Sequence, residues 1–134
     1  MKFILIDYSG LFYKTIAKKN TPVKRSGKFI QIRNNDMEYL VLSPKDLAVY
    51  HANIVERFCI EKGVAGTYNP KRDHYQINEP HWDIAGGGIW TINEKEKSLN
   101  FSGSSQAYGK FDRRELREKV LSVKSMADYI VKID

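Results

Sequence analysis

The first part of the chain alternates short apolar runs with polar turns, a pattern typical of β-structure. Residues 2–6 and 11–17 are rich in residues that favour strands, and the Tyr-Ser-Gly sequence at 8–10 between them predicts a turn. Residues 18–27 are polar and include proline and glycine, so we expect a loop there. This pattern predicts that the chain begins with two strands followed by a loop.

Two further pairs of apolar runs predict antiparallel hairpins. Residues 28–33 and 37–42 flank the polar sequence Asn-Asn-Asp at 34–36, which is typical of a tight turn. Residues 89–92 and 99–101 form a second pair of apolar runs around a polar connection. Strands that follow one another over short turns pair antiparallel, so we expect a mostly antiparallel sheet.

The segment between these two strand pairs begins with signals for a helix. Ser43 is a good N-cap, Pro44 suits the first helical position, and Asp46 lies three residues after the cap. Apolar side chains then recur at spacings of three and four, at Leu47, Tyr50, Ile54 and Phe58. Gly63 predicts the end of the helix, and His51 is expected to border its buried face.

A second helix and a final strand complete the predicted order of elements. Asp112, with Glu115 three residues later, predicts a capped helix that continues to about Val123. Residues 129–133 read as a closing strand. The fold class expected is α+β: a mostly antiparallel β-sheet with two helices packed on it, in a single compact domain over residues 1–134.

Composition agrees with a folded domain that works in a reducing compartment. The chain has 134 residues, of which 42% are apolar and 28% charged, values typical of a folded domain and not of a disordered one. Its one cysteine, Cys59, excludes an internal disulfide and any site that needs two thiolates. The apolar start ends at Asp7, which is too early for a signal peptide, and no run is long enough for a membrane span. We therefore expect a cytoplasmic protein without membrane contact.

The charge is basic and unevenly distributed. The formal net charge is +6, from 22 Lys and Arg against 16 Asp and Glu. Residues 14–33 carry basic side chains and no acidic ones: Lys14, Lys18, Lys19, Lys24, Arg25, Lys28 and Arg33. The segment reads equally well as a solvated hairpin edge or as an anion-binding patch. Because no RNA-binding motif accompanies it, nucleic acid is not the expected partner.

Several familiar enzyme signatures are absent from the sequence. It has no Walker-type phosphate loop, no dinucleotide fingerprint and no Cys-x-x-Cys pair. His74 and His81 lie in the irregular segment 64–82, near Asp73 and Glu79, but their spacing matches no common metal site. We therefore expect neither a metal nor a cofactor.

Three features carry the candidate chemistry, and each also has a purely structural reading. Gly86, Gly87 and Gly88 enter a strand, which indicates a bulge, or a backbone that another group approaches closely. The small-residue loop 102–109 can present consecutive N–H groups to an anion, although a simple connection looks the same. His51 is either a catalytic base or a hydrogen-bonded core histidine.

The order of these features resembles the Janus/Ocnus family of small phosphohistidine phosphatases. The helical sequence Tyr-His-Ala-Asn-Ile at 50–54 is similar to that family's Tyr-His-Ala-Asp-Ile motif. The triple glycine at 86–88, followed by Ser-Gln-Ala-Tyr-Gly at 105–109, resembles its second signature. The sequence Lys-Phe-Ile-Gln-Ile-Arg at 28–33 is similar to its first strand. The resemblance covers about residues 27–134.

This resemblance implies a metal-independent, cofactor-free phosphatase that hydrolyses the P–N bond of phosphohistidine in proteins or of related small phosphoramidates. By position, His51 matches the catalytic histidine and Lys28 a phosphate-contacting lysine. Ser105, Gln106 and Ala107 match the loop whose backbone amides hold the phosphoryl oxygens. These roles are chemically sound, because a phosphoryl group needs positive charge and N–H donors around its oxygens and a base or nucleophile in line. A monomer is expected.

The sequence departs from the family pattern in several places. Asn53 replaces the acid that usually supports the site two residues after the histidine, and Ile89 replaces an arginine that often follows the triple glycine. Residues 68–81 are longer than the family leads us to expect, and residues 1–26 are an extension that the resemblance does not cover. These departures keep a second hypothesis open: a catalytically silent module that binds phospho-ligands on the same fold.

Overall fold

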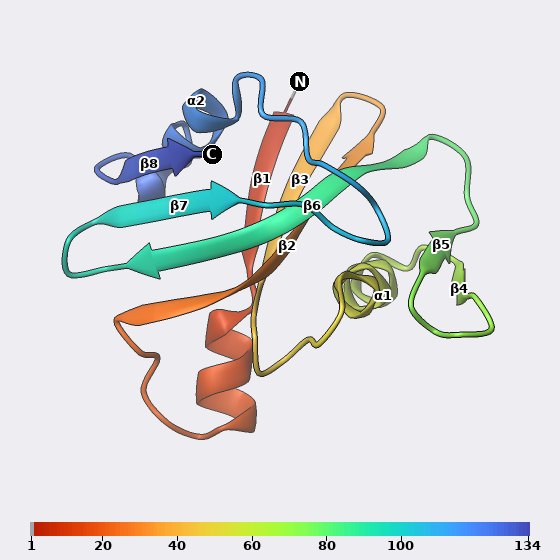
Figure 1. The fold of residues 1–134 in the computed structure, drawn as a ribbon, viewed down its shortest axis with the longest axis horizontal. Coiled ribbons are helices and arrows are strands. Elements are labelled where there is room, and N and C mark those ends of the chain that lie inside the picture. The colour runs from red at the N-terminus through yellow and green to blue at the C-terminus, as the bar shows by residue number, and fades with distance from the viewer. Residues whose placement is uncertain (1) are drawn as a thin grey trace.

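A computed structural model describes residues 2–134 and shows an α+β fold built on one curled sheet (Figure 1). The sheet has six strands in the order β1-β3-β2-β6-β7-β8. Their bounds are β1 Lys2–Asp7, β2 Lys24–Asn34, β3 Met37–Pro44, β6 Trp82–Asn93, β7 Ser98–Ser102 and β8 Ile130–Ile133. Only the outer pairs, β1 with β3 and β7 with β8, are parallel among the described strands, so the expected mostly antiparallel sheet is confirmed.

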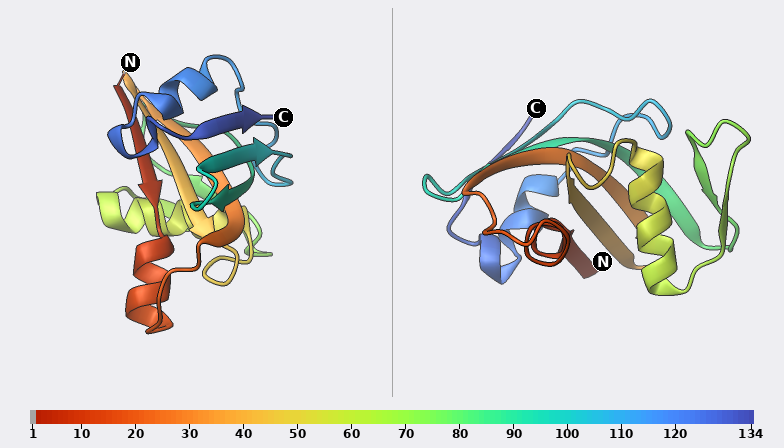
Figure 2. Two further views of the ribbon diagram at one scale, coloured as in Figure 1. Left: turned by 90° about the vertical axis from the view of Figure 1, so that its left-hand side faces the viewer. Right: turned by 90° about the horizontal axis from the view of Figure 1, so that it is seen from below.

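Two α-helices pack on opposite faces of this sheet (Figure 2). They are α1, His51–Lys62, and α2, Leu116–Leu121; a π-helical segment η1, Leu11–Ile16, and a 3-10 turn η2, Lys124–Met126, accompany them. A separate two-stranded hairpin, β4 Gly66–Tyr68 with β5 Tyr75–Ile77, lies beside α1. Among residues 2–134, none of the helices has the length and apolar character needed to cross a membrane.

Side-chain alternation along β2 and β3 separates two hydrophobic cores. Ile30 and Val41 face α1, whereas Phe29 and Leu40 face α2, and all four side chains are fully buried. Trp90 of β6 lies in the α2 core and donates its indole N–H to backbone carbonyls of β2 and β3 at 3.1 Å. Because successive residues of a strand point to opposite faces, the central strands are buried on both sides and their register is strongly fixed.

The strand expected at 11–17 is wrong, because this segment is the π-helical η1. Gly10 has helical backbone angles, φ −60° and ψ −46°, and the N–H of Phe12 donates to the carbonyl of Tyr8 at 3.0 Å. Tyr13 is buried and makes an edge-to-face contact with Phe12. Residues that favour strands do so because their side chains fit a half-buried surface, and they do not by themselves fix the backbone. In this segment the packing of Tyr13 therefore decides the conformation. The loop expected at 18–27 is shorter, because β2 begins at Lys24.

The predicted start of the first helix is also wrong. Ser43 and Pro44 end β3, where Ser43 pairs with Lys28 and its carbonyl accepts the indole N–H of Trp90. The helix begins at His51, with Tyr50 as N-cap residue. Backbone pairing of β3 with β2 therefore outweighs the capping preference of the Ser-Pro sequence. The end was predicted correctly, because Gly63 closes α1 in the left-handed conformation, at φ 69°.

The second helix lacks the cap that the sequence predicts. It starts at Leu116, after Glu115 in the left-handed region, and the Asp112 carboxylate does not cap it. Asp112 instead accepts from Arg114 at 3.0 Å and from Arg33 at 2.9 Å, and these two hydrogen bonds hold its pKa well below the usual range. Arg33 also donates to the fully buried Glu38 at 2.7 Å. The Asp112 carboxylate therefore belongs to a charged network that joins strands β2 and β3 to the segment before α2.

Part of the basic segment 14–33 is neutralised within the fold. Arg25 pairs with Asp7 at 3.4 Å and with Glu94 at 2.9 Å, and only 6% of its side chain is exposed. Arg33 pairs with Glu38 and Asp112 as described above. These two arginines therefore tie β2 to neighbouring elements and do not belong to a free anion-binding surface.

Candidate active site

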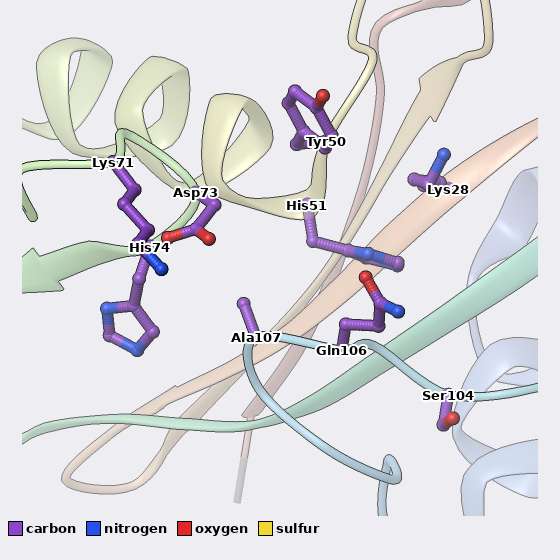
Figure 3. A pocket seen from close by; sticks show the side chains of 9 residues that line it. All are labelled: Lys28, Tyr50, His51, Lys71, Asp73, His74, Ser104, Gln106 and Ala107. Atoms are coloured by element: carbon purple, nitrogen blue, oxygen red, sulfur yellow. The ribbon is translucent and has the colours of Figure 1, made fainter.

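A pocket of about 700 Å³ opens where β2, the start of α1, the β4–β5 hairpin and the loop after β7 meet (Figure 3). Its lining residues are Lys28, Tyr50, His51, Lys71, Asp73, His74, Ser104, Gln106 and Ala107. Four positions expected from the sequence thus lie around one cavity, although they come from three distant segments of the chain: Lys28, His51, and Gln106 with Ala107. A cavity of this size can enclose a ligand larger than a phosphoryl group alone.

His51 is the first residue of α1, and its imidazole is held in one orientation. Its side chain is largely buried, and Nε2 lies 3.0 Å from the carbonyl oxygen of Gly88. A carbonyl can only accept, so Nε2 carries the proton and Nδ1 keeps a lone pair. Burial lowers the pKa of His51 below its ordinary value, the positive charge of Lys28 lowers it further, and the Gly88 bond opposes the shift. The ring is therefore neutral near pH 7.

This arrangement predicts a distinct NMR signature for His51. We expect the proton of the neutral ring on Nε2 and a titration midpoint below pH 6.5, because burial and Lys28 both disfavour the charged form. Activity that depends on the neutral ring should then persist into mildly acidic solution and decline only at lower pH. ¹⁵N–¹H correlation spectra of the imidazole during a pH titration measure both properties. A proton on Nδ1, or a midpoint above 7, would contradict the geometry.

The three glycines allow β6 to approach the histidine and the neighbouring strand closely. A Cβ on Gly87 would lie 2.6 Å from the carbonyl oxygen of Phe29 and 2.9 Å from Cδ2 of His51. A Cβ on Gly88 would lie 2.3 Å from the Ser102 carbonyl oxygen, and Gly86 adopts φ +150° beside the loop that follows Gly109. The pairing of β2 with β6 shifts register next to Gly86. The predicted bulge with close backbone approach is therefore confirmed.

Lys28 supplies a cation at one end of the pocket. It lies on β2, and its Nζ donates to the carbonyl of Val49, just before α1, at 2.9 Å. One donor is thereby used to orient the ammonium group, and the other N–H bonds are left for an anion. Ile89 pairs directly with Lys28 across β2 and β6, and 48% of its surface is exposed. The position where the family often carries arginine is thus next to the lysine.

The loop after β7 presents fewer amides than the sequence suggests. The N–H of Ser105 donates to the Gly109 carbonyl at 3.0 Å, the reverse bond measures 2.8 Å, and the Ser105 hydroxyl accepts from the N–H of Tyr108 at 3.1 Å. Ser105 therefore closes the loop internally. Within residues 2–134, the N–H groups of Gln106 and Ala107 have no protein acceptor. Two backbone amides, and not the expected three, are therefore left to bind an anion. The Gln106 side chain is directed toward the His51 ring (Figure 3).

Asn53 supports the helix that carries His51. Its Oδ1 accepts from the N–H of Tyr50 at 2.9 Å, and its Nδ2 donates to the hydroxyl of Tyr68 at 3.2 Å. No hydrogen bond joins Asn53 to His51 among the described residues. The side chain therefore stabilises the N-terminus of α1. An amide oxygen can accept the Tyr50 N–H hydrogen bond in the same way as the carboxylate oxygen of an aspartate would.

The segment 68–81, which is longer than the family pattern leads us to expect, forms a wall of the pocket. Tyr108 docks it on the loop after β7: its hydroxyl accepts from the N–H of Tyr75 at 2.9 Å and donates to the Tyr75 carbonyl at 2.7 Å. Lys71, Asp73 and His74 thereby reach the cavity. The available signal was the unusual length of this segment between two site motifs. Within residues 2–134, no three His, Cys, Asp or Glu side chains are grouped as a metal site.

Comparison with known proteins identifies one family. The model of the Janus/Ocnus family (Ocnus) matches residues 23–129, which includes every site position predicted from the sequence. A search of curated proteins finds no match. The matched range begins just before β2 and ends just before β8, so it takes in the β4–β5 hairpin and excludes β1 and η1.

Proposed function

The chain belongs to the Janus/Ocnus family, and on this basis we propose that it is a phosphatase that hydrolyses the P–N bond of phosphohistidine, in proteins or in related small phosphoramidates. The proposed reaction uses no metal and no cofactor, because the pocket's own residues supply the charge and the donors. The proposal includes a monomeric enzyme in the cytoplasm, in keeping with the single, buried free thiol of Cys59.

One observation carries this proposal: a neutral imidazole, a lysine, and two residues whose backbone N–H groups have no acceptor within residues 2–134 line the same cavity. Lys28 and the N–H groups of Gln106 and Ala107 are suited to the phosphoryl oxygens, whose negative charge they balance. The lone pair on Nδ1 of His51 is suited to act on phosphorus or on an attacking water. Burial keeps this ring neutral near pH 7, so it is ready to accept a proton or a phosphoryl group.

Two routes are compatible with these positions. As a general base, Nδ1 takes a proton from water while the water oxygen bonds to phosphorus and the P–N bond breaks. As a nucleophile, Nδ1 itself bonds to phosphorus, and water then hydrolyses the phosphorylated His51. In both routes the leaving nitrogen keeps the electron pair of the broken bond and gains a proton from solvent. Rapid acid-free quenching with ³²P-labelled substrate separates them, because only the second route labels the protein.

The exposed Ile89 favours one alternative function. Isoleucine at this position beside Lys28 offers no charge to a phosphoryl group, so we expect weaker phosphate binding than an arginine there would give. A module that binds phospho-ligands without turnover would tolerate this loss better than an enzyme. Such a module would bind inorganic phosphate and release none from phosphohistidine.

Replacing Lys28 tests the phosphate-binding half of the site. We expect Lys28→Met to lower kcat/KM for phosphohistidine by roughly 10- to 100-fold, because it removes a charged hydrogen bond worth about 1.5–3 kcal/mol. Lys24→Met is the matched control, since Lys24 lies on the same face of the same strand, four residues away and outside the pocket. Rates are measured by release of inorganic phosphate, with phosphoserine as a P–O comparison. Equal rates for both variants would contradict the role of Lys28.

A further inference from the structure

The wall formed by the β4–β5 hairpin gives the pocket a second, differently charged end. Lys28 and Ser104 lie on one side of His51, and Lys71, Asp73 and His74 gather on the other (Figure 3). The tip of the hairpin, residues 69–74, contributes all three of these side chains. The proposed phosphatase chemistry uses none of them.

The tip of this hairpin is internally braced. The side-chain oxygen of Asn69 accepts from the N–H of Asp73 at 3.0 Å and from the N–H of His74 at 3.1 Å. The backbone N–H of Asn69 donates to the His74 carbonyl at 3.0 Å, and its side-chain amide donates to Oδ1 of Asp73. The guanidinium of Arg72 stacks on the ring of Tyr68, 4.1 Å from its centre. A loop held in this way presents its side chains in fixed directions.

The hairpin is also fixed relative to the catalytic end of the pocket. Tyr108 binds the backbone of Tyr75 through both hydrogen bonds described above, and its ring centre lies 4.8 Å from that of His74. On the other side, the Tyr68 hydroxyl donates to Glu56 of α1 at 2.9 Å. The helix that carries His51 and the loop that carries Gln106 therefore both hold the hairpin, so the two ends of the pocket keep a constant separation.

This second end of the pocket carries one positive and one negative side chain. Lys71 is positive and Asp73 negative, yet no ion pair joins them within residues 2–134. One carboxylate oxygen of Asp73 is bound by Asn69, which orients the group, and the other oxygen has no protein donor in the described chain. An ammonium and a carboxylate that line the same end of a pocket without pairing with each other complement a ligand that carries both opposite charges.

We propose that this end of the pocket binds the amino-acid end of a free, N-phosphorylated amino acid such as phosphohistidine. This inference rests on the proposed function, since it takes the phosphoryl group to lie between Lys28 and His51. Lys71 then binds the α-carboxylate, and Asp73 binds the α-ammonium group. A phosphohistidine inside a protein has neither charge, because both groups are in peptide bonds. The wall therefore favours small zwitterionic phosphoramidates over histidine-phosphorylated proteins.

Three substrates separate this inference from the proposed function. They are free phosphohistidine, N-acetyl-phosphohistidine amide, which lacks both charges, and phosphoimidazole, which lacks the amino-acid end altogether. We expect the wild type to hydrolyse free phosphohistidine with a kcat/KM about tenfold or more above that of the other two. Lys71→Met and Asp73→Asn should each lower this value about tenfold for free phosphohistidine and leave phosphoimidazole unchanged. Lys95→Met, an exposed lysine in the turn after β6, is the control variant.

Each outcome has a defined meaning. Two results would overturn the inference and leave the phosphatase proposal intact. One is an equal kcat/KM for free phosphohistidine and its capped form. The other is a loss of activity in Lys71→Met and Asp73→Asn that is the same for all three substrates. Hydrolysis of phosphoimidazole is the reference, because it requires only the Lys28 end of the pocket. If no compound is hydrolysed by the folded wild type, the proposed function fails, and this inference fails with it.

Discussion

His51→Ala is expected to lower kcat/KM for phosphohistidine by roughly 10²–10⁴-fold, the range that a positioned acid–base group contributes. The reason is geometric: His51 supplies the lone pair at Nδ1, while Gly88 holds the ring through Nε2. No other histidine is placed to replace it, since His74, which also lines the pocket, lies on the opposite wall (Figure 3). Release of inorganic phosphate at several substrate concentrations, corrected for uncatalysed loss, gives the ratio.

Two controls make this result specific. His81→Asn removes an exposed histidine outside the pocket, and asparagine tolerates the φ of +70° found there, so its rate should equal that of the wild type. Circular dichroism and thermal unfolding should show that His51→Ala remains folded, because the histidine lies at the edge of a cavity. A folded His51→Ala protein with wild-type turnover would refute the assigned role.

Gly87→Ala is expected to destabilise the fold by about 1–3 kcal/mol, the usual cost of overpacking. Its Cβ would lie 2.6 Å from the backbone oxygen of Phe29 and 2.9 Å from the His51 ring. The backbone of β2 is fixed on both sides by neighbouring strands, so the histidine must move instead. We therefore expect a loss of turnover larger than the loss of folded protein. Urea unfolding and kcat/KM, measured on the same preparation, give the two effects separately.

Gly10→Ala is expected to have the opposite effect on stability. Gly10 has φ −60°, and a Cβ there would meet nothing within 4 Å. Alanine at such a position stabilises by about 0.4–1 kcal/mol, because it reduces the freedom of the unfolded chain.

If Gly87→Ala unfolds at the same urea concentration as the wild type, the close approach of β6 to His51 is not as described.

The sheet and four of the nine residues that line the pocket could be predicted, because they depend on local patterns and short motifs. The nearly continuous apolar runs at 28–33 and 37–42 reflect strands buried on both faces, and the turn between them contains Asn35 in the left-handed region. The triple glycine predicted a close backbone approach without any knowledge of the partner strand. The motif residues His51 and Lys28 followed from the resemblance to the family.

The remaining features depend on contacts between distant segments. Ser43 and Pro44 look like the start of a helix, but the pairing of β3 with β2 extends through both residues. Ser105 matches the phosphate loop in sequence, yet its amide closes that loop by binding Gly109. The position of the β4–β5 hairpin depends on the Tyr108 hydroxyl, 33 residues from its partner Tyr75. No local pattern contains these pairings.

The most direct measurement is phosphate release from phosphohistidine by the folded wild-type chain in the presence of EDTA, followed by ³¹P NMR. We predict inorganic phosphate to appear well above the uncatalysed rate, with EDTA having no effect. Separate spectra, recorded with inorganic phosphate and without substrate, report binding to the pocket independently of turnover. A folded protein that binds phosphate but releases none from phosphohistidine would contradict the enzymatic account and identify the chain as a phospho-ligand-binding module.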